Sequence, residues 1–372
     1  MKKDKDVGGA ERAGKLAAGG DAGGGADSKP APGGTPIAGG VITLAHGSGG
    51  KAAHELISRF FLPFFDNPIL RNMDDQGVFA VDKGRLALTT DTYVVSPLFF
   101  RGGDIGRLAV CGTVNDLAVC GARPLYLSAG FVIEEGLGTD ALQRILASMR
   151  DAAAEASVSI ITADTKVVEK GACDGLFINT SGVGLVPEGI EMSARFVKPG
   201  DCVLLSGTIG DHGIAVVSER EGISFETDVR SDCAPLAGMV EAMLAAGARP
   251  HAMRDPTRGG LATTLNEIAI SSGVEMEVEE DKIPVNPSVR SACELLGFDP
   301  LHVANEGKLV AFVPEADADK ALRAMRASKY GQSAALIGRV VSAGEPRVFM
   351  KTRIGGRRFV DMLVGEQFPR IC

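Results

Sequence analysis

The final residue of the chain, Cys372, is the group in this sequence best placed to do chemistry. A thiolate is a nucleophile, and a thiol at a chain end can move between two sites because only one end is tethered. The closing GEQFPRIC predicts an exposed thiol. The terminal carboxylate should raise its pKa slightly above about 8.5, and Arg370 could oppose that rise. An exposed thiol is easily oxidised, so this pattern indicates a working nucleophile more than a chance terminus.

Several carboxylates lie where a predicted strand meets a turn or helix. Carboxylates beside Gly, Thr and Asn suit hard cations that hold phosphate oxygens, because Mg²⁺ binds through one or two carboxylates plus water. Asp also commonly caps turns and helix starts, and spacing alone does not decide between these uses. The candidates are Asp75 in NMDDQGV, Asp91 in LTTDTYV, Asp116 with its neighbour Asn115 in TVNDLAV, and Asp255 in RDPTRGGL.

The glycine-rich stretch HGSGGK could cradle a phosphate group. It contains Gly47, Ser48, Gly49, Gly50 and Lys51, and a predicted helix follows it. Consecutive backbone N–H groups at a helix start favour an anion, and Lys51 could add positive charge. The stretch does not match the P-loop pattern, and a flexible loop without a ligand is the alternative interpretation.

Two further motifs carry charged residues that could move protons. ADTKVVEKG places Asp164 and Lys166 on one face of a predicted strand. A lysine on a buried strand is costly unless it is paired, so either pairing with Asp164 or a function must account for it. In NEGKL, Glu306 precedes another predicted strand and could be a base, a metal ligand or a turn residue.

Strands and helices alternate along the chain, and these elements must position the candidate residues. The pattern restarts near residues 186–187, which predicts two α/β or α+β domains. The predicted helices span about 49–62, 104–119, 140–156, 236–246 and 259–272. The predicted strands span about 84–91, 124–134, 159–168, 175–186, 274–279 and 308–313.

Composition narrows the class of protein. The net charge of −8 argues against general binding to nucleic acid, which needs a basic face. No stretch reaches the roughly 18 apolar residues of a membrane span, and the charged start lacks the apolar core of a secretory signal. The six internal cysteines are predicted to be small buried side chains, with neither disulfides nor a zinc site. We therefore expect a cytoplasmic protein whose Gly/Ala-rich residues 1–40 form a disordered tail.

Together these motifs resemble the HypE family of hydrogenase maturation factors, within the superfamily of aminoimidazole ribonucleotide synthetase and selenophosphate synthetase. The resemblance runs from about residue 41 to 372 and rests on HGSGGK, MDDQGV, the run from Thr89 to Pro124, ADTKVVEKG, SGTIGDHG, RDPTRGGLATTLNE, NEGKL and PRIC. It implies a PurM-like, two-domain fold, α/β followed by α+β. The implied domains are an ATP-binding and dimerisation domain over 41–186, an α+β domain over 187–350 and a mobile C-terminal segment over 351–372.

The resemblance also implies a reaction. In this family a carbamoyltransferase, HypF, places a carbamoyl group on the terminal cysteine, here Cys372. ATP is then used to dehydrate that group to a thiocyanate. The cyanide passes to iron carried by a HypC–HypD complex, for the active site of nickel–iron hydrogenase. A homodimer is the implied assembly.

By the same resemblance, Asp75, Asp91, Asp116 and Asp255 would hold Mg²⁺ and the ATP phosphates. Asn115 and the stretch Gly47–Lys51 would complete the nucleotide site. Asp164, Lys166 or Glu306 would take the amide protons from the group on Cys372, with no basis for choosing among the three. His212 in SGTIGDHG is a further candidate, although a role at a helix start is an equal alternative.

Two other functions remain open at this point. One is another synthetase of the superfamily, making selenophosphate or closing an imidazole ring. A selenophosphate synthetase would be expected to carry cysteine or selenocysteine near its first glycine loop, whereas the first cysteine here is Cys111. The other is a nucleotide-binding scaffold without enzymatic activity, which the concentration of carboxylates disfavours.

Overall fold

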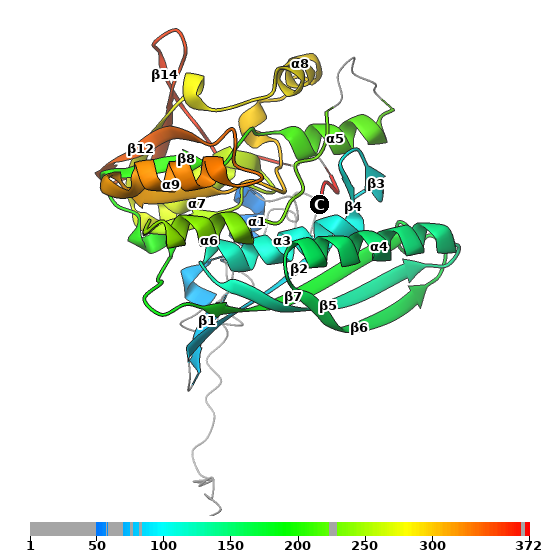
Figure 1. Ribbon diagram of the computed structural model, residues 1–372. Coiled ribbons are helices and arrows are strands. Elements are labelled where there is room, and N and C mark those ends of the chain that lie inside the picture. The colour runs from blue at the N-terminus through cyan, green and yellow to red at the C-terminus, as the bar shows by residue number, and fades with distance from the viewer. Residues whose placement is uncertain are drawn as a thin grey trace, which may run out of the picture.

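The computed structural model describes residues 50–56, 58, 70–74, 77–81, 84–222, 229–365 and 369–372 (Figure 1). The tail predicted over residues 1–40 and four predicted site residues lie outside this part of the chain. Those four residues are Gly47, Ser48, Gly49 and Asp75. Within the described ranges, no helix is long and apolar enough to cross a membrane.

Five strands form the first sheet, in the order β1-β2-β7-β5-β6. Neighbours are antiparallel except β5 and β6, which are parallel and joined through helix α4. Buried and half-buried residues alternate along β7, so one face of the sheet is covered more deeply than the other. The strands are β1 (Gly77–Val81), β2 (Gly84–Tyr93), β5 (Arg123–Glu134), β6 (Ser159–Val168) and β7 (Leu176–Val186).

Helices α3 (Ile105–Val119) and α4 (Thr139–Glu155) lie on one face of this sheet, and no described helix covers the other (Figure 1). The short strands β3 (Phe99–Phe100) and β4 (Gly103–Asp104) lead into α3. Asp104 caps α3, because its carboxylate accepts hydrogen bonds from two backbone N–H groups of the first turn at 2.7 and 3.1 Å. Nearly every residue of α3 is buried, since the helix contacts β2 and β7 as well as α4 and α6.

Seven strands form the second sheet, in the order β14-β13-β10-β12-β8-β11-β9. All neighbours are antiparallel except β10 and β13. The strands are β8 (Asp201–Leu205), β9 (Ala252–Arg254), β10 (Val274–Glu279), β11 (Val310–Pro314), β12 (Ala335–Ala343), β13 (Arg347–Lys351) and β14 (Arg357–Phe359). The remaining helices are α1 (Gly50–Leu56), α5 (Asp211–Arg220), α6 (Ala237–Ala245), α7 (Gly260–Ser272), α8 (Pro287–Leu296) and α9 (Glu315–Ala327).

One apolar cluster joins the two units and includes the end of the chain. It contains Leu108 of α3, Ile178 of β7, Ile214 of α5 and Ile371 from the C-terminus. The chain end is therefore part of a core, and the loops between the two units are held close to it. This shared core is what places side chains from both halves around one site.

Most of the predicted elements are present. The helices predicted over 104–119, 140–156, 236–246 and 259–272 correspond to α3, α4, α6 and α7, and α1 occupies the described start of the one predicted over 49–62. The prediction that 159–168 is a buried strand is wrong in one respect: β6 is a strand, but it is the edge of the sheet and is exposed along most of its length. The six internal cysteines are buried and unpaired, as predicted.

Candidate functional site

The last four residues lie against the body of the protein, and the prediction of an exposed Cys372 is wrong. Cys372 is 8% exposed and Ile371 is 4% exposed. The backbone N–H of Val94 donates to an oxygen of the terminal carboxylate of Cys372, and that of Ser96 donates to the carbonyl of Arg370, both at 3.1 Å. The tail thus pairs in antiparallel fashion with the segment that follows β2, which satisfies backbone groups that would otherwise prevent burial.

The thiol of Cys372 lies near charged side chains, of which Glu306 is buried, Asp91 is half-buried and Arg258 is exposed. Burial raises its pKa to about 12; Arg258 opposes the rise, while Glu306 and Asp91 add to it. Arg258, which sequence reasoning missed, follows Asp255 in RDPTRGGL. The cation facing the thiol is therefore Arg258. Arg370, which was expected in that role, pairs with Asp174 instead.

Glu306 is the predicted proton-transfer residue that the structure brings to Cys372. It is 2% exposed, and its Oε1 has no hydrogen-bond partner. Burial raises its pKa well above the ordinary value, the charges of Asp255 and Asp91 raise it further, and Arg258 opposes them. A side-chain hydrogen bond with Glu306 is among the causes that raise the pKa of the Cys372 thiol. The site therefore pairs a neutral thiol with a carboxyl group that holds its proton more tightly than usual.

The loop that carries Glu306 is fixed on both sides. Asn305 accepts from the N–H of Gly210 at 2.8 Å and donates to the carbonyl of Pro256 at 2.9 Å. The N–H of Glu306 donates to Asp232 at 3.0 Å. At Gly307 a Cβ atom would stand 1.8 Å from the carbonyl oxygen of Asp232, so only glycine fits there. Glu306 is consequently preorganised by its own backbone.

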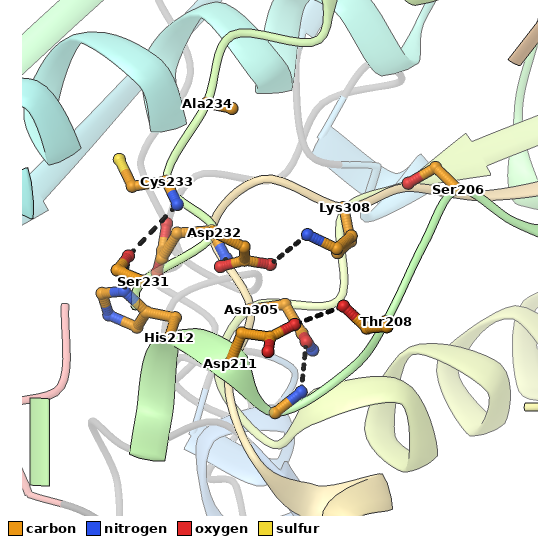
Figure 2. A network of polar contacts seen from close by, with 12 residues as sticks. Ser206, Thr208, Asp211, His212, Ser231, Asp232, Cys233, Ala234, Asn305 and Lys308 are labelled. Atoms are coloured by element: carbon orange, nitrogen blue, oxygen red, sulfur yellow. Dashed lines mark hydrogen bonds and ion pairs between the residues drawn. The ribbon is translucent and has the colours of Figure 1, made fainter. Parts of the chain in front are cut away.

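A buried ion pair anchors the same loop (Figure 2). Lys308 Nζ lies 3.0 Å from Asp232 Oδ2, and both side chains are less than a tenth exposed. Burial alone would raise the pKa of Asp232, but the ammonium group of Lys308 holds it below its ordinary value. Asp232 therefore remains ionised while accepting from both the Glu306 backbone and the Lys308 ammonium group. Sequence reasoning missed this pair, because the two residues meet only through the fold.

Asn115 is used by the protein's own backbone. It is fully buried; its amide nitrogen donates to the carbonyls of Ala234 and Glu306 at 3.1 and 3.2 Å, and its oxygen accepts from the N–H of Leu236 at 2.8 Å. The amide nitrogen and the amide oxygen of Asn115 are therefore both used in hydrogen bonds within the protein. Asn115 holds the Glu306 loop to α3, and its contact with nucleotide stays a prediction.

The three predicted aspartates in the described chain surround this site. Asp91 and Asp255 both raise the pKa of Glu306, and Asp91 and Asp116 both raise the pKa of Tyr93, for which burial is the largest cause. Asp116 also accepts from the hydroxyl of Thr89 at 2.8 Å. In the described ranges no three Asp, Glu, His or Cys side chains converge closely enough to hold a metal by themselves. An all-oxygen donor set with spaced carboxylates suits Mg²⁺, which retains water or phosphate oxygens as its other ligands.

The other predicted residues lie elsewhere. Asp164 and Lys166 form an exposed ion pair on β6, with Nζ 2.7 Å from Oδ2. Residues that align across neighbouring strands point to the same face of the sheet. Asp164 aligns with Gly130 and, through it, with Asn179, whereas Asp91 aligns with Thr180, the buried neighbour of Asn179 on β7. The Asp164–Lys166 ion pair therefore lies on the face of the sheet opposite Asp91. One chain therefore does not bring Asp164 and Lys166 to its own Cys372.

The described end of the glycine-rich stretch contacts the segment before the tail. The N–H of Lys51 donates to the carbonyl of Leu363 at 3.3 Å. Gly50 has a positive φ of 74°, and a Cβ there would stand 2.3 Å from that same carbonyl oxygen. Glycine is thus required at position 50 by a close approach of two backbones. The stretch and the chain's C-terminal segment are neighbours.

Two family models match the chain. AIR synthase related protein, N-terminal domain, matches residues 73–186, and AIR synthase related protein, C-terminal domain, matches residues 198–351. The chain is 55% identical over 337 residues to carbamoyl dehydratase HypE of Cupriavidus necator, which covers 90% of this chain and 96% of that protein.

Two solved structures are similar as well. A HypE–HypF complex has a TM-score of 0.78 at 49% identity, covering 83% of this chain and 99% of that chain. Hydrogenase maturation protein HypE in complex with ATP has a TM-score of 0.76 at 51% identity, covering 89% of this chain and 100% of that chain.

Removing Lys308 should destabilise the fold strongly. Lys308→Ala leaves the buried Asp232 charge without its partner, and we expect a loss of about 3–5 kcal/mol in the free energy of unfolding. Urea denaturation followed by circular dichroism measures this loss. The matched control, Lys282→Ala, removes an exposed pair with Glu279 and should leave the midpoint unchanged; equal effects of the two substitutions would refute the anchoring role of Lys308.

The Cys372 thiol should resist ionisation while the tail is docked. Its pKa of about 12 lies above the value of about 8.5 for a free thiol, so docking is fully stable below about pH 8.5 and is lost as pH rises towards 12. The difference in thiolate absorbance between the protein and a Cys372→Ser variant isolates this one group during a pH titration. A complete ionisation step near pH 8.5 would show that the thiol is not buried.

Proposed function

The chain belongs to the HypE family of carbamoyl dehydratases, and on that premise we propose that the carbamoyl group it dehydrates sits on its own Cys372. The enzyme acts in hydrogenase maturation and uses ATP, as the names of its relatives and the ATP complex of one of them indicate. The observation that carries the proposal is the burial of Cys372 beside Glu306 and Arg258. A chain end folded into a charged site is expected if that end is the substrate.

The proposed reaction converts a poor leaving group into a good one. The oxygen of the S-carbamoyl group attacks the γ-phosphorus of ATP, forming a C–O–P linkage and releasing ADP. Both N–H protons leave to bases, the C–O bond breaks, inorganic phosphate departs and a C≡N bond remains on the sulfur of Cys372. Because the substrate is tethered to the enzyme, its encounter with the site costs little translational entropy.

The residues around the thiol fit these steps. Glu306 is within hydrogen-bonding reach of the thiol, and because its pKa is raised, its carboxylate form is a stronger base than an ordinary one for a proton from an amide nitrogen. Of the three bases that the sequence left open, the geometry of one chain favours Glu306 over Asp164 and Lys166. Arg258 would provide a positive charge beside the thiol, where negative charge develops.

Asp91, Asp116 and Asp255 would hold Mg²⁺, which neutralises phosphate charge when it is bound. These carboxylates lie on β2, on α3 and just after β9, so the site draws on both units of the fold. Lys51 and the glycine-rich stretch would bind the phosphates, as the resemblance to the HypE family implies. Asn115 would act indirectly, by holding the Glu306 backbone.

The proposed partners follow from the two ends of the reaction. A HypF-type carbamoyltransferase would load Cys372, and a complex of one relative with HypF supports this step. Iron held by a HypC–HypD complex would accept the cyanide. Seven cysteines without a disulfide favour the cytoplasm as the compartment.

A homodimer through the open face of the first sheet completes the proposal. That face carries Leu88, Val183 and Tyr126 in one row across three strands, and Leu88 and Tyr126 are 51% and 47% exposed. No described helix covers this face (Figure 1). Exposed apolar rows of this kind are typical of interfaces. Asp164 and Lys166 lie on the same face, so a second copy would bury or contact them.

Replacing the two central residues should separate the steps. Cys372→Ser removes the acceptor, so neither carbamoylation nor dehydration should occur. Glu306→Gln should still accept the carbamoyl group from HypF and carbamoyl phosphate but should dehydrate it roughly 10²–10⁴-fold more slowly. The mass of the C-terminal peptide reports both steps. Glu294→Gln, an exposed residue on α8, is the control; dehydration at the wild-type rate in Glu306→Gln would remove Glu306 from the mechanism.

Charging the open face of the sheet should dissociate the dimer. Tyr126→Asp places a carboxylate in the apolar row and should weaken association at least tenfold, because an unpaired charge is costly in an interface. Sedimentation velocity over a range of concentrations measures this. Leu146→Asp replaces a residue of similar exposure, 44%, on α4 and should leave the dimer intact. A wild-type chain that sediments as a monomer at all concentrations would contradict the proposed assembly.

A further inference from the structure

The three backbone carbonyls before Cys372 and the terminal carboxylate of Cys372 each accept a hydrogen bond from the body of the protein. Two of the donors are backbone N–H groups, and the others are the side chains of Arg220 and His212. The contacts are Arg220 Nη1 to Pro369 O at 2.6 Å, Arg220 Nη2 to Arg370 O at 2.7 Å, Ser96 N to Arg370 O at 3.1 Å, His212 Nε2 to Ile371 O at 2.8 Å and Val94 N to Cys372 O at 3.1 Å.

Both side-chain donors belong to helix α5. His212 lies in its first turn and Arg220 is its last residue, so about 12 Å of helix axis separates them. The C-terminus lies beside this helix (Figure 1). One rigid element therefore holds the tail at two points, and the two contacts are set at a fixed distance from each other.

The imidazole of His212 is held in one orientation. Its Nδ1 lies 2.8 Å from the hydroxyl of Ser231, whose oxygen accepts from the N–H of Cys233 at 3.1 Å (Figure 2). The ring of Phe100 meets the imidazole edge-on, with centroids 5.4 Å apart. Burial lowers the pKa of His212, so the ring is neutral. Because a carbonyl only accepts, Nε2 carries the proton that is donated to Ile371.

The guanidinium of Arg220 ties the tail to its neighbouring segment. Arg220 makes two contacts with the tail through Nη1 and Nη2, and its Nε donates to the carbonyl of Ser96 at 2.8 Å. A planar fork of donors can satisfy three carbonyls in this way, whereas a lysine ammonium group on a flexible chain would lack the same geometry. Arg220 thus joins the tail, α5 and the segment after β2.

We propose that Arg220 and His212 form a latch, defined by these two side chains, that holds the tail docked for dehydration. The inference rests on the proposed function. Both side chains act on backbone oxygens of the tail, so both are positioning residues. The latch binds backbone carbonyls, so it accepts the tail whether the sulfur of Cys372 carries a proton, a carbamoyl group or a cyano group.

The latch acts on one of the two chemical steps. Loading of Cys372 by a separate carbamoyltransferase requires the buried thiol to leave its site, whereas dehydration requires the tail to be docked. Loosening the latch should therefore slow dehydration without slowing carbamoylation. A residue that only stabilised the fold would impair both steps together.

Alkylation of Cys372 tests the latch without ATP or a partner. The protein is exposed to iodoacetamide, and labelling of the C-terminal peptide is followed by mass spectrometry. Arg220→Ala removes two hydrogen bonds to the tail and His212→Ala removes one, so each substitution should raise the released fraction, and with it the labelling rate, at least roughly tenfold. Arg150→Ala, an exposed arginine on α4, should label like the wild type. Unchanged labelling in both latch variants would overturn the proposal.

The six internal cysteines report on unfolding in the same experiment, because all are buried. If their labelling rises as much as that of Cys372, Arg220 and His212 merely hold the fold together, and the proposal fails. His212→Gln places an amide N–H near the position of Nε2 and should restore slow labelling in part. Equal labelling of His212→Gln and His212→Ala would argue against the hydrogen bond to Ile371.

Single-turnover assays complete the test. In Arg220→Ala, the rate of carbamoylation by HypF relative to the rate of dehydration of carbamoylated Cys372 should rise roughly tenfold, because the ratio of released to docked tails rises by that factor. Equal losses in both steps would overturn the proposal. If the wild type carries out neither step, the proposed function fails, but the alkylation rates still decide whether the latch exists.

Discussion

A chain end can be buried only if its backbone oxygens find donors, and this constraint shapes the site. The tail of this protein meets it with donors from α5 and from the segment after β2. Once the carbonyls are satisfied, Ile371 can join the apolar core and Cys372 can sit beside Glu306 and Arg258. The position of the thiol thus depends on backbone contacts more than on any property of sulfur.

Burial has opposite consequences for the two proposed steps. It raises the pKa of Cys372 to about 12, so the docked thiol is a poor nucleophile and is better placed to be acted upon than to attack. It also raises the pKa of Glu306, which suits a group that exchanges protons with an amide. The same site therefore favours chemistry on a group already attached to sulfur, and the attack that attaches the group belongs to the released tail. The buried Asp232–Lys308 pair keeps the Glu306 loop in place for both states.

Local patterns predicted much of the fold. The apolar spacing of α3, and the alternation that puts Asp164 and Lys166 on one face of β6, are properties of neighbouring residues. The motif around Glu306 was recognisable in the same way. The contacts of the site were not, because they join distant parts of the chain. Asp232 meets the N–H of Glu306 across 74 positions, and Arg258 reaches Cys372 only through the fold. The exposed thiol was wrongly predicted because no local pattern reveals donors that lie in α5.

The route of one oxygen atom tests the central claim, that ATP activates a carbamoyl group carried by Cys372. The protein would be loaded with carbamoyl labelled with heavy oxygen and given unlabelled ATP in unlabelled water. If the carbamoyl oxygen takes the γ-phosphoryl group, the label must appear in inorganic phosphate as the thiocyanate forms on Cys372. Label released into water, with unlabelled phosphate, would contradict the account, because the C–O bond would then break without a phosphate ester.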